Sequence, residues 1–235
     1  MNLFYVEHKS HVGGRYSVFS EVGIVPAYIM GLNINKLRSE ILECFKKNGK
    51  IFLKRSVIEL VKILESKKFS NLIFLNYAPN LEKFLYWCQQ LIAESLGKKK
   101  LGFLPMISNT PKDHHSLLQL YLDGPKDKLF YIFSDKTHTS HLFKSNLKIH
   151  NLSFLEKKSL SKIKEAQKNA LIKSLRKKKI PFREFKITRS NEQIIGKLFS
   201  YFILETVIVG RMLNINPFDQ PAVEEVKIFT KKILS

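Results

Sequence analysis

Cysteine is scarce in this chain of 235 residues, which contains only two, Cys44 and Cys88. Each lies singly within an apolar helical pattern. This excludes a disulfide framework and a thiolate metal site of the usual kind. Two His-x-x-His pairs, one at 8 and 11 and one at 138 and 141, have no carboxylate or cysteine partner at a metal-site spacing. We therefore expect buried thiols and no metal site.

Long uninterrupted apolar runs are also missing. The longest apolar stretch, residues 198–213, is interrupted by a serine, a glutamate and an arginine and is shorter than the roughly 20 residues that span a bilayer. The N-terminus has no basic start followed by an apolar centre, as a signal peptide would. We expect no membrane association and a cytoplasmic protein. With 44% apolar residues the chain can bury a substantial core, which excludes wholesale disorder.

Acidic residues are outnumbered two to one, giving a formal charge of +20. Such a charge suggests an anionic polymer as partner. However, 33 of the 40 basic residues are lysine, the strongly hydrated point charge, and a solvated lysine surface is the simpler interpretation. Residues 144–189 are the most basic segment. No helix-turn-helix, zinc-finger or aromatic RNA-binding signature accompanies the charge, so nucleic-acid binding is not expected.

The apolar pattern predicts an α/β fold with a parallel sheet. Four β-rich runs alternate with helical stretches, an order typical of a doubly wound, three-layer domain with helices on both faces. The predicted strands are 72–76, 102–107, 129–133 and 183–187. The predicted helices of this region are 81–96, 115–122, 155–178, 191–212 and 220–233.

Residues 1–66 follow another pattern. A short strand at 3–6 precedes helices at 17–30, 35–47 and 52–66, and the strand has no partner in this segment. Because an unpaired strand promotes aggregation, residues 1–66 are interpreted as the tail of a larger unit or as a segment that packs on the following domain, residues 67–235.

The segment GGRYS at 13–17 is the first candidate for chemistry. Two glycines permit close backbone approach, and the following helix would offer free N–H groups to an anion, with Arg15 adding a positive charge. The alternative is a glycine turn with a surface arginine.

Glu94 is the second candidate. It lies in the last turn of a helix that ends at Gly97. The negative end of the helix dipole disfavours an ionised carboxylate, a placement that suits a general base. The alternative is an ordinary exposed ion pair with Lys98, four residues later.

Two further segments lie near predicted element boundaries. His115 follows the strand at 102–107, where open parallel sheets bind ligands, and could exchange a proton near neutral pH or merely pack its helix. Gln220 and Lys227 lie two turns apart on the last helix, so they share a face. That face matters only if it meets a ligand.

Together these segments closely resemble phosphoglucose isomerase, the family that interconverts glucose 6-phosphate and fructose 6-phosphate. GGRYS resembles one family signature, and the stretch 210–227, with Phe218-Asp219-Gln220 and Lys227, resembles the other. The segments AESLGK at 93–98 and HSLLQLYLDGP at 115–125 are also similar to family segments, in the family order.

The resemblance implies no metal or organic cofactor, and it implies a role for each candidate. Glu94 matches the base that moves a proton between carbon 2 and carbon 1 through a cis-enediolate, and Arg15 matches the residue that stabilises the enediolate charge. His115 matches the ring-opening histidine, which in the family comes from the partner subunit of a dimer. Four residues match substrate-binding positions, and two of them, Arg15 and Lys227, are also counted among the catalytic groups: Gly14, Arg15, Gln220 and Lys227.

The resemblance also implies two sugar isomerase (SIS) domains, of which this chain holds the second, preceded by the tail of the first. The first domain, with its Ser-Lys-Thr phosphate loop, should precede Gly13, but only twelve residues do. The chain is therefore interpreted as a C-terminal half that lacks this loop and has a missing N-terminal half or a second copy as partner. Residues 134–139 superficially resemble such a loop but occur in the wrong order, so we expect no role for them. The alternative function is a non-catalytic sugar-phosphate-binding SIS domain.

Overall fold

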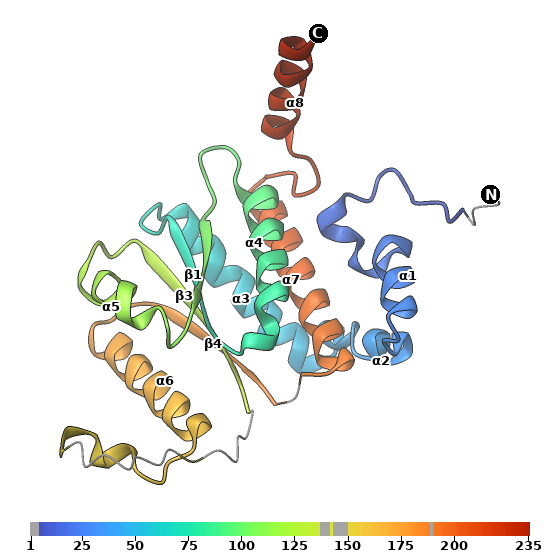
Figure 1. The fold of residues 1–235 in the computed structure, drawn as a ribbon. Helices are drawn as coiled ribbons and strands as arrows, with labels where there is room; N and C mark the ends of the chain where they lie inside the picture. Colours follow the sequence, from blue (N-terminus) through green and yellow to red (C-terminus); the bar gives the residue numbers. More distant parts are fainter. Residues whose placement is uncertain (1–4, 137–141, 143–149, 189) are drawn as a thin grey trace. The chain divides into compact units, whose positions relative to one another are not determined.

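The computed structural model describes residues 5–136, 142, 150–188 and 190–235 (Figure 1). These residues form two compact units. Unit 1 consists of the described residues up to Lys68, of Tyr86–Leu104 and of Asn191–Ser235. Unit 2 consists of Phe69–Leu85 and the described residues of Pro105–Ser190.

Unit 2 is built on a four-stranded sheet with the order β2-β1-β3-β4 (Figure 1). The strands are β1 (Asn71–Tyr77), β2 (Leu104–Asn109), β3 (Lys128–Asp135) and β4 (Phe182–Ile187). β3 pairs in parallel with both β1 and β4. All four predicted strands and the parallel arrangement are confirmed. The central strands β1 and β3 are almost wholly buried, as their continuous apolar sequences require.

Two helices of unit 2, α5 (His114–Asp123) and α6 (Leu160–Lys177), pack on the sheet through one apolar cluster. The members of this cluster come from β1, β3, α5, α6 and the segment after α6: Ile73, Leu75, Tyr77, Tyr121, Phe130, Ile132, Leu171, Ile172, Leu175 and Ile180. The prediction placed the start of α6 five residues too early. Ser159 caps the helix by accepting a hydrogen bond from the Lys162 backbone N–H, so α6 begins at Leu160.

The strand order reverses beside β1. The chain passes from β1 to β2 on one side and then returns to β3 on the other. In open parallel sheets, ligands bind beyond the carboxyl ends of the strands at such a reversal. The carboxyl ends of β1 and β3, at Tyr77 and Asp135, are therefore the place in unit 2 where a ligand site is expected.

The central helix of unit 1 is α7 (Glu192–Met212), against which α2 (Ile34–Ser39) and α3 (Lys47–Glu65) pack. A Cβ atom at Gly196 would lie 1.8 Å from the Leu37 carbonyl oxygen, so only glycine permits this approach of α2 to α7. On α7, Glu205 is buried but accepts hydrogen bonds from Ser56 of α3 and from Tyr201. The buried carboxylate is thus satisfied within the helix packing.

α7 is also, among the described residues, the one helix long and apolar enough to cross a membrane by length and composition. Of its most apolar window, 44% is buried inside the structure. Its contacts with α2 and α3 and its buried glutamate are those of a core helix, and length and composition alone are weak grounds for a membrane span.

The N-terminal helices differ from prediction. In place of one helix at 17–30, a 3-10 helix, η1 (Gly14–Phe19), precedes α1 (Glu21–Ile29), because Ser20 between them has an extended backbone. The predicted helix at 35–47 is similarly divided, into α2 and the short η2 (Glu43–Phe45). Tyr5 and Val6 are in no strand, and the rest of the strand predicted at 3–6 lies outside the described residues.

α4 (Glu82–Leu96) and α8 (Pro221–Leu234) match their predictions closely, and two short 3-10 helices, η3 (Pro79–Leu81) and η4 (His150–Leu155), complete the described elements. The described residues up to Lys68 share a compact unit with two later segments. The division into domains 1–66 and 67–235, the three layers and the SIS classification stay predictions.

Candidate active site

Arg15 is the centre of a buried polar cluster in unit 1. Arg15 is only 3% exposed, and all five N–H groups of its guanidinium have a protein acceptor. The acceptors are Ser95 Oγ at 2.9 Å from Nε, Glu94 Oε2 at 3.2 Å and Gln220 Oε1 at 2.9 Å from Nη1, and the carbonyls of Pro217 at 2.8 Å and Asp219 at 3.0 Å from Nη2. The alternative of a surface arginine is wrong.

Local structure explains how Arg15 reaches this cluster. The tight turn of η1 turns its side chain inward, and the indole N–H of Trp87 donates to the Arg15 carbonyl at 3.0 Å. Next in the chain, the Tyr16 hydroxyl lies 2.8 Å from Ser95 Oγ and donates to the Pro217 carbonyl at 3.0 Å. Burial raises the pKa of the Tyr16 hydroxyl, so it remains a neutral donor.

Glu94 stands in the last turn of α4 and meets Arg15 at the edge of the cluster. Its side chain is 29% exposed, so the carboxylate combines a buried counter-charge with access from outside. Oε2 pairs with Arg15, and Oε1 accepts a hydrogen bond from Gln90 Nε2 at 3.1 Å. Lys98 pairs instead with Asp219, with 2.8 Å between Nζ and Oδ1. The interpretation of Glu94 as half of an exposed pair with Lys98 is therefore wrong.

The connection between α7 and α8 supplies the other wall of the cluster. Lys98 Nζ donates to the carbonyls of Asn216 at 2.5 Å and Asp219 at 2.6 Å, which holds the connection against the end of α4. The hydrogen bond from Lys98 is the main cause that lowers the pKa of the Asp219 carboxyl. Gln220, which ends this connection, turns its side chain to Arg15.

The other predicted binding residues of unit 1 stand apart from this network. Lys227 is exposed on α8, where its Nζ pairs with Glu224 Oε1 at 2.7 Å. Gly14 begins η1, and a Cβ atom added there would meet no atom within 4 Å. The chain itself thus does not require glycine at 14, and a close approach to a ligand stays a prediction, as does a ligand contact of Lys227.

In unit 2, His115 is exposed near the start of α5, beyond the carboxyl end of β2 as predicted. Its neighbour His114 is half-buried, with Nε2 2.8 Å from the Tyr77 hydroxyl. Burial lowers the pKa of the His114 imidazole. Sequence reasoning missed this pair, although Tyr77 ends β1 and His114 follows the adjacent strand.

Sequence reasoning also missed Ser95, Tyr16, Trp87 and Lys98 as parts of the Arg15 cluster. Tyr16 and Ser95 adjoin the predicted site residues Arg15 and Glu94, and Lys98 lies within the family-like segment 93–98. These positions in the sequence could have identified the three residues. Among the described residues, no group of three or more histidine, cysteine, aspartate or glutamate side chains could hold a metal ion. His138 and His141 lie outside the described residues.

A partly exposed carboxylate beside a fixed, buried guanidinium can perform one kind of chemistry well. The carboxylate can accept a proton from carbon, while the guanidinium stabilises negative charge that develops on an adjacent oxygen. Nothing in this pair specifies which substrate is bound.

The sequence profile of the family described as phosphoglucose isomerase matches residues 2–235. The chain belongs to the phosphoglucose isomerase family. The family predicted from the sequence is thus confirmed, and with it the prediction that the chain belongs to an enzyme family.

Among the relatives of this family member is the glucose-6-phosphate isomerase of Methanocaldococcus jannaschii, which is 33% identical over 227 residues. The match covers 92% of this chain and 55% of that protein. The glucose-6-phosphate isomerase of Campylobacter jejuni is 32% identical over 96% of this chain and 57% of its own length. The chain thus spans about half the length of the curated relatives it matches.

Solved structures agree in fold. A hypothetical protein from Thermus thermophilus matches 95% of this chain and 55% of its own length, with a TM-score of 0.83 at 24% identity. A glucose-6-phosphate isomerase from Chlamydia trachomatis matches 94% of this chain and 47% of its own length, with a TM-score of 0.73 at 18% identity. At these identities the likeness supports the fold alone.

Proposed function

We propose that this chain takes part in the interconversion of glucose 6-phosphate and fructose 6-phosphate, with Glu94 as the base. The observation that supports this proposal is the pairing of Glu94 with the buried Arg15. Family membership supplies the substrate, because the relatives are named glucose-6-phosphate isomerases.

In the proposed reaction Glu94 removes the proton from carbon 2 of the open-chain aldose. The carbonyl at carbon 1 then takes up the electron pair, and a cis-enediolate forms with negative charge on oxygen. Glu94 returns the proton to carbon 1 as the carbonyl forms at carbon 2, and the hydroxyl proton of oxygen 2 passes to oxygen 1. One carboxylate can serve both carbons because they are adjacent, so the proton travels only a short distance.

Arg15 must exchange a partner in order to act on the enediolate. Its five donors are all occupied, so a substrate oxygen can bind only where a protein acceptor leaves. The two backbone carbonyls and Ser95 hold Nε and Nη2 from the buried side. Glu94 and Gln220 both accept from Nη1, and the proposed substrate oxygen takes the place of one of these two acceptors.

The remaining assignments follow from the family resemblance. His115 opens the sugar ring, while Gly14, Gln220 and Lys227 contact the sugar phosphate. The same resemblance proposes a homodimer or a missing N-terminal half, a cytoplasmic location and an SIS architecture. Because the chain spans about half of its relatives, the phosphate loop is assigned to the part of those proteins that it does not match.

The test replaces Glu94 by Gln, which keeps the shape of the side chain and removes the base. The assay follows glucose 6-phosphate formation from fructose 6-phosphate, with the chain alone and with the unmatched part of the M. jannaschii relative added. We expect kcat to fall by at least ~10²-fold. Arg15→Met should cost about 3 kcal/mol of transition-state stabilisation.

Glu65→Gln is the matched control, because Glu65 is an exposed carboxylate at the end of α3 and the charge change is the same. Its turnover should equal that of the parent. Turnover of Glu94→Gln within threefold of the parent would overturn the assignment of the base. Substrate binding without turnover in every mixture would favour a non-catalytic sugar-phosphate-binding domain instead.

A further inference from the structure

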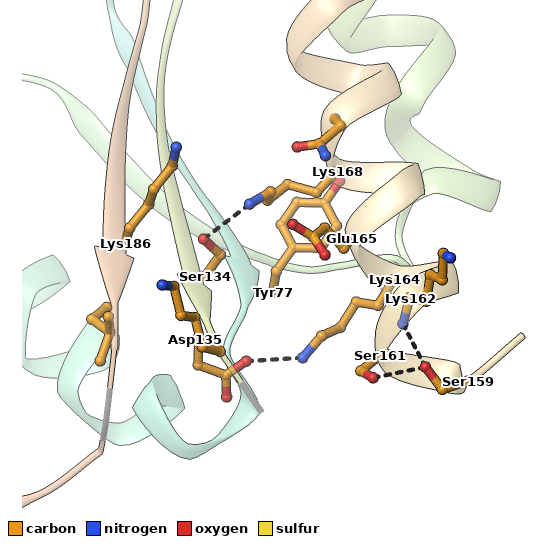
Figure 2. Close-up of a pocket in the computed structure, with 13 residues that line it drawn as sticks. Tyr77, Ser134, Asp135, Ser159, Ser161, Lys162, Lys164, Glu165, Lys168 and Lys186 are labelled. Atoms are coloured by element: carbon orange, nitrogen blue, oxygen red, sulfur yellow. Dashed lines mark hydrogen bonds and ion pairs between the residues drawn. The ribbon is translucent and has the colours of Figure 1, made fainter. Parts of the chain in front are cut away.

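A cavity of about 760 Å³ opens in unit 2 at the carboxyl ends of β1, β3 and β4 (Figure 2). It lies at the reversal of strand order between β1 and β3, where parallel sheets bind ligands. Its size falls within the range of small-molecule sites. The first turns of α6 form the opposite wall, and every residue that lines the cavity belongs to unit 2.

Positive charge dominates the lining of this cavity. Five lysines line it, against two carboxylates, Asp135 and Glu165, and a third carboxylate, Glu184, pairs with two of the lysines. The lysines come from three elements or their ends: Lys136, Lys162, Lys164, Lys168 and Lys186. The lysines therefore outnumber the carboxylates even when Glu184 is included, and an anion gains from the excess.

Lys168 is the fixed cation of the cavity. It is only 8% exposed, and Figure 2 shows its side chain reaching from α6 toward β3. Its Nζ lies 3.4 Å from Ser134 Oγ and 3.3 Å from Glu184 Oε1. The Lys168 ammonium and the Ser134 hydroxyl can both donate hydrogen bonds to one bound anion. Because the ammonium is already held in place, binding avoids the entropy cost of ordering a free lysine side chain.

The start of α6 adds a second, independent source of positive potential. Ser159, Ser161 and Lys162, from the N-cap and first turn, line the cavity, so the positive end of the dipole of this 18-residue helix faces it. The hydroxyls of Ser159 and Ser161 lie 3.0 Å apart and supply further polar groups. The N-terminus of α6 and the lysines thus both favour an anionic ligand.

We propose that this cavity binds a small phosphate group, as inorganic phosphate or a phosphate monoester, through Lys162, Lys168 and Ser134. A concave site of this volume suits a small anion better than a nucleic-acid strand, which requires an extended surface. Sequence analysis assigned no role to residues 134–139. The site uses Ser134 and Lys136 of that segment but needs none of the residues outside the described ranges.

The experiment titrates inorganic phosphate into the full chain at constant ionic strength, balanced with KCl, and follows backbone amide shifts by NMR. We expect saturable shifts at Ser134, Ser161 and Lys168. The double variant Lys162→Gln/Lys186→Gln should weaken binding about fivefold or more, because two cations leave the cavity. Both lysines are exposed, so the fold should persist. Ser134→Ala should weaken binding without changing the charge.

Lys173→Gln is the matched control, since Lys173 is an exposed lysine of α6 outside the cavity, and its affinity should stay within twofold of the parent. Equal weakening by Lys173→Gln, or shifts spread over the lysine surface without saturation, would overturn the site. A glucose 6-phosphate arm identifies the source of the phosphate: competition at the same residues indicates a monoester, and binding of inorganic phosphate alone indicates the free ion. The readout needs no isomerase activity, so its failure and that of the proposed function remain distinguishable.

Discussion

Nε of Arg15 donates to Oγ of Ser95 at 2.9 Å, although 80 positions separate the two residues in the chain. Ser95 is fully buried, and its hydroxyl also contacts the Tyr16 hydroxyl at 2.8 Å. Ser95 directly follows Glu94, so one helix end supplies both a counter-charge and a fixed hydrogen-bond partner to the same guanidinium. The orientation of Arg15 toward Glu94 thus depends on a residue with no reactive role of its own.

Ser95→Ala should therefore lower both stability and turnover. The change leaves Nε of a buried guanidinium without its acceptor, a loss on the order of 1–3 kcal/mol in the free energy of unfolding, measured by urea denaturation. In a mixture able to turn over, kcat should fall more than KM rises, because Arg15 is misaligned rather than removed. Ser66→Ala, at an exposed serine, is the control. Unchanged stability and unchanged kcat would contradict this positioning role.

His115→Ala should slow cyclic substrate more than an open-chain analogue. By the proposed role, the imidazole assists ring opening and takes no part once the sugar is linear. The measurement compares kcat/KM for fructose 6-phosphate and for an open-chain substrate analogue in the parent and the variant. Equal losses on both substrates would rule out ring opening as the function of this exposed histidine.

The chain by itself should show little isomerase activity. Contacts to a remote phosphate help hold the reacting carbons against the base, and the proposed loop for them belongs to the part of the relatives that this chain does not match. Adding the unmatched part of the M. jannaschii relative should raise the rate of glucose 6-phosphate formation sharply. Full turnover by the chain alone would show that it builds a complete phosphate site.

His114 should make folding stability fall on the acid side of neutrality. Burial lowers the pKa of His114 below its ordinary value of 6.5. As pH falls below about 6.5, the unfolded chain therefore takes up this proton first, and stability is lost until pH passes below the folded pKa. His114→Gln should flatten the decline in urea midpoint between pH 7 and pH 5. The exposed neighbour variant His115→Gln should retain it, and an identical decline in His114→Gln would exclude His114 as the cause.

Local patterns were sufficient for most elements of unit 2. The apolar runs at β1 and β3 are long enough to require burial on both faces, and their alternation with amphipathic helices requires crossover connections and hence parallel strands. Near the N-terminus the same reasoning was wrong at Ser20. An extended residue between two helical segments leaves the apolar periodicity nearly intact, so periodicity alone does not reveal the break.

The sequence and the tertiary structure each determined a different part of the candidate site. Residue types and spacing singled out Arg15, Glu94 and Gln220, and family resemblance assigned them a reaction. Only the tertiary structure decided that Arg15 is buried with every donor occupied, that Lys98 pairs with Asp219 rather than with Glu94, and that five lysines line one cavity with Ser134. Hydrogen bonds and ion pairs depend on atoms within about 4 Å, and residues far apart in the chain reach that distance only after the helices and strands have packed.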